Sequence, residues 1–190
     1  MTISEGTIRE FVIAAHSDLE KVQEMLEAQP ALLGVSHQWG PDDYEDGIGA
    51  AAHVGNREIA EFFLAQGVPG NICVLAMLGR ADQVNKALHA DPSEANARGA
   101  HGIPVMFHAA MSGNIEVAEE LKKYGCNEGY SFALHGAINH GHVQMVAWLL
   151  GNGADDLSVR DYQGKTPLQR ATESNLPQVE TLLRDHGATE

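Results

Sequence analysis

The chain has 190 residues, of which 44% are hydrophobic and 20% charged, as in proteins that bury a core and unlike disordered or fibrous chains. Its formal net charge is −14, which disfavours binding to nucleic acid or to anionic membrane surfaces. The N-terminus lacks the basic start and apolar run of a secretory signal, and no apolar stretch of about 18 residues occurs. We therefore expect a cytoplasmic protein with neither nucleic-acid nor membrane partners.

The first predicted helix pair covers residues 7–30, and charges mixed into its opening helix are typical of a capping unit. A long connector over 31–46 follows and holds an aromatic and acidic cluster. Exposed Trp and Tyr are enriched in binding hot spots, and carboxylates select cationic partner groups. The alternative is that Trp39 packs over the first unit and covers its apolar end. The cluster consists of Trp39, Asp42, Asp43, Tyr44 and Glu45.

Two further helix pairs are predicted over 46–68 and 69–92. In each, a short Ala-rich helix precedes a helix with an apolar i, i+3, i+4 stripe, such as Ile59, Phe62 and Phe63. Neither helix can bury its apolar face alone, so we expect the pairs to stack on one another. The connector after Gly67 is too short for a projecting loop.

Three more pairs are predicted over 101–126, 129–154 and 161–188. The connector that joins the first two of these, over 126–131, is also shortened. The last pair carries Glu180 and Arg184 where the earlier pairs have apolar residues, which indicates a solvent-facing cap.

Short motifs in these units show a resemblance to a known repeat family. Thr166 to Ala171 reads Thr-Pro-Leu-Gln-Arg-Ala and resembles the ankyrin signature Thr-Pro-Leu-His-x-Ala, with Gln169 in place of the histidine. The glycines at 79 and 113 lie 34 residues apart, close to the ankyrin repeat length. The resemblance covers residues 7–188 and implies an all-α ankyrin-repeat solenoid of about six helix–turn–helix units. We expect one domain over 1–190, with two shortened connectors, one long connector and a monomeric state.

The resemblance implies a protein–protein interaction module that binds a partner in a concave groove formed by turn tips and inner-helix edges. We expect an apolar centre at Met77, Leu78 and Met111 with a polar rim, and hence a partner protein carrying basic and apolar groups. The candidate partner-binding residues are Trp39, Asp42, Asp43, Tyr44, Glu45, His53, Met77, Leu78, His101, Ile103, His108, Met111, His140 and Tyr162. A spacer whose outer face joins an assembly is a further possibility.

The chain contains ten histidines, so metal and acid–base sites need consideration. His135 and His142 occupy positions where the ankyrin family places histidine, and we expect them to hydrogen-bond between units. No two of the remaining histidines show a zinc-motif spacing such as His-Glu-x-x-His, so no metal ligand, cofactor or catalytic residue is predicted. The residues that fall near the exposed edge of inner helices are His16, His53, His108 and His140.

An alternative function uses this histidine row. An imidazole titrates near neutral pH and is the usual general acid or base. His53, His108 and His140 could then serve a small-molecule-binding protein or an enzyme, provided that the curvature of the solenoid brings them together.

Overall fold

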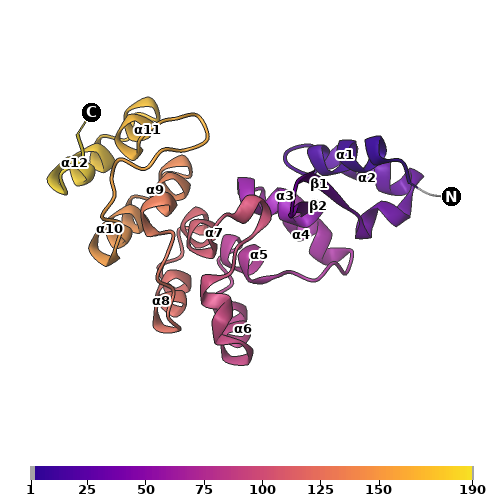
Figure 1. Ribbon diagram of the computed structural model, residues 1–190, viewed down its shortest axis with the longest axis horizontal. Helices are drawn as coiled ribbons and strands as arrows, with labels where there is room; N and C mark the ends of the chain where they lie inside the picture. Colours follow the sequence, from indigo (N-terminus) through magenta and orange to yellow (C-terminus); the bar gives the residue numbers. More distant parts are fainter. Residues whose placement is uncertain (1–2, 190) are drawn as a thin grey trace.

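The computed structural model describes residues 3–189, which form six successive helix pairs. Figure 1 shows the pairs following one another along the longest axis of the molecule, with the two chain termini at opposite ends. The inner helices are α1 (Glu5–Ala14), α3 (Gly47–Val54), α5 (Ile72–Met77), α7 (Val105–Ser112), α9 (Tyr130–Asn139) and α11 (Pro167–Glu173). The outer helices are α2 (Leu19–Ala28), α4 (Arg57–Ala65), α6 (Ala81–Ala90), α8 (Ile115–Lys123), α10 (Val143–Asn152) and α12 (Pro177–Asp185). The expected all-α solenoid is confirmed.

Local sequence explains where the helices begin and end. Polar side chains such as Asn56 and Asn114 precede outer helices and accept hydrogen bonds from backbone N–H groups that the helix leaves unpaired. Between the two helices of the second to sixth pairs the chain turns through a left-handed residue, for example Gly55 with φ 76° and Gly113 with φ 68°. Glycine adopts this conformation without the steric cost that a Cβ brings.

Stacking of the inner helices produces the core. Ala51, Ala76, Ala110 and Ala137 are fully buried, and their small side chains let neighbouring helices approach closely. Each inner helix contacts the next along the chain, from α3 through α5, α7 and α9 to α11. Within residues 3–189, no helix is long and apolar enough to cross a membrane.

Two histidines link adjacent units as expected. His142 Nε2 lies 3.0 Å from the carbonyl oxygen of Met111, and His135 Nε2 lies 3.2 Å from that of Val159. Each ring therefore pairs a backbone carbonyl of a neighbouring segment, which satisfies polar groups at the junction between units.

The long connector contains the strands of the structure. After the 3₁₀ turn η1 (Pro30–Gly34), strands β1 (Ser36–Gly40) and β2 (Asp43–Asp46) form an antiparallel hairpin in which His37 faces Glu45 and Gln38 faces Tyr44. The equivalent projection before α7 is a loop over residues 98–104 that includes the short turn η3 (Ala100–Gly102). A second 3₁₀ turn, η2 (Pro92–Asn96), precedes this loop.

We refer to the hairpin 36–46 and the loops 98–104 and 161–165 as fingers. The connector between α4 and α5 covers only residues 66–71 and forms no finger, as its length predicts.

Candidate functional site

A buried carboxylate lies at the base of the first finger. Glu45 belongs to β2 and is 1% exposed. Because side chains alternate along a strand, Glu45 points inward while its neighbour Tyr44 points to solvent and is 58% exposed. The indole Nε1 of Trp39, from β1, donates a 2.7 Å hydrogen bond to Glu45 Oε2. The hairpin thus holds this carboxylate inside the protein.

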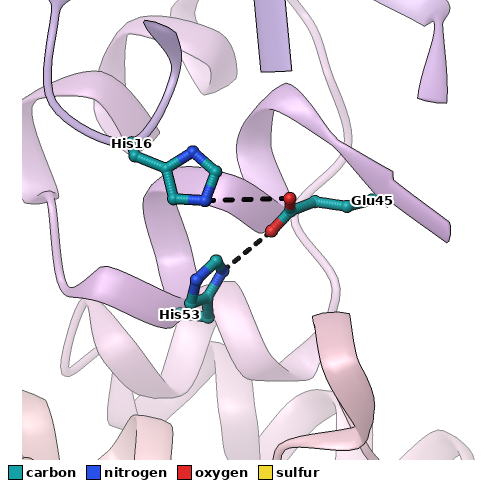
Figure 2. Close-up of side chains that lie close together, drawn as sticks. All are labelled: His16, Glu45 and His53. Atoms are coloured by element: carbon teal, nitrogen blue, oxygen red, sulfur yellow. Dashed lines mark ion pairs between the residues drawn. The ribbon is translucent and has the colours of Figure 1, made fainter. Parts of the chain in front are cut away.

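Three histidines from different elements surround this carboxylate. His53 of α3 places Nδ1 2.8 Å from Glu45 Oε1, and His16, just after α1, places Nε2 3.7 Å from Oε2. Figure 2 shows both rings directed at the carboxylate from separate elements. His101 of η3 approaches from the next finger, with Nε2 3.4 Å from Oε1. We name these four residues the histidine–glutamate cluster.

The missing finger of the third unit explains why His101 reaches the cluster. Since residues 66–71 project nothing between them, the hairpin and the loop 98–104 contact each other directly. His101 Nδ1 lies 2.9 Å from Asp43 Oδ2 of β2, which fixes this contact. His101 adopts a left-handed conformation, φ 56°, and this turns its side chain at the fingertip.

The far nitrogens of two rings are held by other groups. His16 Nδ1 lies 2.9 Å from the carbonyl oxygen of Val12, and His101 Nδ1 contacts Asp43 as described. An imidazole that donates its Nδ1 proton to such an acceptor keeps a lone pair on Nε2. In both residues it is Nε2 that faces Glu45.

Opposing effects set the ionisation of Glu45. Burial alone would raise its pKa, but contact with His53 and the hydrogen bond from Trp39 outweigh burial and hold the pKa below its ordinary value. Glu45 is therefore a carboxylate at neutral pH. His53 Nδ1 and Glu45 Oε1 are both buried, and despite their separation of 2.8 Å neither makes a hydrogen bond of acceptable direction.

Several predicted site residues thus come together. Trp39, Asp43, Glu45, His53 and His101 form one contiguous group. His16 was recognised as a residue of an inner-helix edge, but its pairing with Glu45 was not foreseen, because nothing in the spacing of 16 and 45 indicates contact.

The structure places the residues of the predicted apolar centre in the core. Met77, Leu78 and Met111 are 1%, 4% and 6% exposed and pack in the core. The guanidinium of Arg57 donates hydrogen bonds to the carbonyl oxygens of Met77 and Leu78 and covers the end of α5. These side chains therefore expose little surface to a partner.

His108 is also buried, at 1% exposure, with its Nδ1 near the carbonyl oxygen of Pro104. Burial lowers the pKa of His108 to about 4, so its ring is neutral at neutral pH. A direct role for it on a bound molecule is inconsistent with this position. The exposed His140 stacks on His142 instead, with ring centroids 6.1 Å apart.

Three predicted residues remain on the surface or near it. Asp42 lies exposed at the hairpin turn, and Tyr162, in the finger before α11, is 87% exposed. Ile103 is half-buried against the core beside the fingertip of His101.

The stacked helix pairs define a helical repeat protein, and the histidine–glutamate cluster lies where two of its fingers meet two inner-helix ends. The family model of ankyrin repeats in three copies matches residues 11–155 and again 106–189. The chain therefore belongs to the ankyrin-repeat family. Ankyrin repeats in general act as protein–protein interaction modules.

Individual relatives match parts of the chain. An ankyrin repeat protein of fowlpox virus, FPV014, is 30% identical over 115 residues, which is 58% of this chain and 26% of the viral protein. The mouse B-cell lymphoma 3 protein homolog is 36% identical over 86 residues, 45% of this chain and 18% of its own length. The chain thus spans about a quarter or less of these curated relatives.

Among solved structures, an ankyrin repeat domain from Acinetobacter baumannii AYE is similar in fold. Its TM-score is 0.50 and its sequence identity 24%, with 95% of this chain and 98% of that chain covered.

Proposed function

We propose that the chain binds a partner protein through its inner face, which we define as the fingers and the C-terminal ends of the inner helices. The observation that carries this proposal is the distribution of exposed large hydrophobic side chains over residues 3–189. These residues are Ile13 at the end of α1, Tyr44 on β2, Val54 at the end of α3 and Tyr162 in the last finger. All of them lie on the inner face, and the outer helices contribute none.

Exposed apolar and aromatic side chains on one face of a repeat protein supply the anchors of an interface. Their exposed surfaces face solvent, so a partner can cover them. Tyr44 and Tyr162 on the rim therefore take the anchoring role that was expected of Met77 and Met111, which are buried.

The charge of the chain selects the chemistry of the partner. With a formal net charge of −14, the protein attracts basic surfaces and repels acidic ones. Asp42 adds an exposed carboxylate beside Tyr44 at the tip of the hairpin. A partner with apolar groups flanked by lysine or arginine is therefore expected.

The proposal is tested by photo-crosslinking. A benzoylphenylalanine placed at Tyr44 or Tyr162 is expected to capture the same partner from native cell extract, identified by mass spectrometry. The matched control places the probe at Glu119, which is exposed on the outer helix α8. Equal or stronger capture of that partner from position 119 would assign binding to the outer face and refute the proposal.

A second measurement gives the contribution of the anchors. With the captured partner purified, Tyr44→Ala and Tyr162→Ala are each expected to weaken binding about 5- to 30-fold, the loss of 1–2 kcal/mol typical of an aromatic anchor. Binding should also weaken as salt concentration rises, because the charges at the rim are solvent-exposed.

A further inference from the structure

The histidine–glutamate cluster has the composition of a transition-metal site. Within it, the donor atoms of His16, Glu45 and His53 all lie within 4.8 Å of one another. Two imidazoles and a carboxylate are a ligand set used for zinc and for divalent iron. His101 Nε2, 3.4 Å from Glu45 Oε1, supplies a fourth donor at the same carboxylate.

The spacing of the donor atoms suits a shared ion. Zinc binds imidazole nitrogen at about 2.0–2.1 Å and carboxylate oxygen at about 2.0–2.2 Å, so neighbouring ligand atoms in a tetrahedral site lie roughly 3.3 Å apart. The distances to Glu45 Oε1 are 2.8 Å from His53 Nδ1 and 3.4 Å from His101 Nε2, and the distance from His16 Nε2 to Glu45 Oε2 is 3.7 Å. These values lie on both sides of the tetrahedral distance.

The directions of the buried atoms give independent support. His53 Nδ1 and Glu45 Oε1 are each buried without a hydrogen-bond partner, although they are 2.8 Å apart. A simple His–Glu pair would align the N–H bond with the oxygen, because a buried polar group without a partner is costly. A cation in contact with both atoms would satisfy them better than this misaligned pairing does.

The surrounding groups match those that orient metal ligands. Metal-bound histidines usually donate their second ring nitrogen to a carbonyl or carboxylate, which fixes the tautomer and the ring direction. His16 does so to the Val12 carbonyl oxygen and His101 to Asp43. Trp39 donates to Glu45 Oε2 and fixes the carboxylate in the same way.

Charge and access also fit a divalent cation. Glu45 and Asp43 bring two carboxyl groups to the cluster, and imidazoles bind a metal ion in their neutral form, so the donor set suits a divalent ion. An open depression of about 440 Å³, lined by Ile13, His16, Ser17, Trp39 and His101, reaches the cluster from solvent. An ion can therefore enter without unfolding the protein.

We propose that His16, Glu45 and His53 bind a divalent first-row transition-metal ion, with His101 as the fourth ligand and Asp43 positioning His101. The sequence pattern predicted no metal ligands, because the four donors come from two inner-helix ends and two fingers. This proposal is independent of partner binding at Tyr44 and Tyr162.

The test is a zinc titration of metal-free protein in competition with a chromophoric chelator. The wild type is expected to bind one equivalent of Zn²⁺, and His53→Ala and His16→Ala are expected to bind at least 100-fold more weakly. Asp43→Asn, which changes only a positioning residue, should weaken binding about 10- to 100-fold. The matched control His89→Ala removes an exposed histidine of outer helix α6 and should leave the affinity unchanged.

Folding of every variant is checked by circular dichroism before titration. If a change at His16 or His53 unfolds the chain, His101→Ala and Asp43→Asn decide the matter, since both lie in partly exposed fingers. Co²⁺ provides a spectroscopic readout: its visible d–d bands in the folded protein should be lost in His101→Ala or His53→Ala. The proposal is overturned by a folded wild type that binds no saturable equivalent, or by an affinity that these variants leave unchanged.

Discussion

The indole of Trp39 donates a part-buried hydrogen bond of 2.7 Å to the carboxylate of Glu45, across the two strands of the hairpin. This bond joins the buried carboxylate of the first finger to the indole ring of the opposite strand. Trp39 was expected either to bind a partner or to cover the first unit. Because Trp39 is half-buried and bonded to Glu45, it has a structural role in the finger. This role does not depend on what its exposed edge contacts.

Replacing the indole by a ring without a donor tests this bond. Trp39→Phe is expected to lower the free energy of unfolding by about 1–3 kcal/mol, because it leaves a buried carboxylate oxygen without its donor. Urea unfolding followed by circular dichroism measures the change. Tyr44→Phe, on the solvent side of the same hairpin, serves as the control and should alter stability by less than about 0.5 kcal/mol. Equal effects of the two substitutions would contradict the assignment.

The buried ring of His108 predicts a pH dependence. Because burial lowers its pKa from 6.5 to about 4, the unfolded chain binds a proton on this residue between those values and the folded chain does not. Stability therefore falls as pH drops below 6.5, by about 1–2 kcal/mol between pH 6.5 and 5. Urea midpoints at pH 7.5 and 5.0 should differ less for His108→Gln than for the wild type. The same pH dependence in both proteins would rule out this origin.

Two glycines with the same backbone conformation distinguish the cost of backbone strain from the cost of a steric clash. Gly113 and Gly141 have φ 68° and 71°, but a Cβ at 113 would lie 2.6 Å from the ring of His142, whereas at 141 nothing lies within 4 Å. Gly141→Ala should cost about 1–2 kcal/mol from the left-handed backbone alone. Gly113→Ala should cost at least about 1 kcal/mol more, since the ring is held by the Met111 carbonyl oxygen. Thermal unfolding of the pair measures the difference, and equal costs would disprove the clash.

Asp161 organises the last finger. Its carboxylate accepts hydrogen bonds from the backbone N–H groups of Gln163 and Lys165 and from Arg170 Nε at 2.9, 3.0 and 2.9 Å. Burial would raise the pKa of Asp161, but these donors outweigh burial and lower the pKa. Their stabilisation of the folded state therefore persists at neutral pH and is lost as pH falls through the lowered pKa.

Asp161→Ala should therefore cost about 1–3 kcal/mol at pH 7, and this cost should shrink as pH falls through the lowered pKa. Hydrogen exchange should show faster exchange confined to residues 161–176. The control is Asp156→Ala, whose carboxylate accepts hydrogen bonds from Ser158, two residues along the chain, on the surface. Faster exchange throughout the chain would show that Asp161 acts on more than its own finger.

Periodicity predicted the repeat architecture because each unit repeats the same local physics. The turn glycines, the alanines of the inner helices and the apolar stripes of the outer helices all act within a unit or between adjacent units. His135 and His142 could be assigned to junctions for the same reason.

The site was harder to predict because it depends on distances that no local pattern encodes. Met77 and Leu78 were placed in the groove by their position relative to Gly79, yet Arg57 from the preceding unit closes over that end of α5. His16, Glu45, His53 and His101 come together only because the array curves and the third unit has no finger. Ile13 was overlooked as an exposed side chain because its helix reads as apolar on either side of it.

Because the third unit has no finger, units that are not neighbours in the array contact each other. In a regular repeat array each unit senses only the next one, so units can in principle melt or be deleted one at a time. Here the loop that carries His101 touches the hairpin two units earlier, so we expect the first four units to unfold together. We then expect truncation from the N-terminal side to destabilise this block more than truncation from the C-terminal side does.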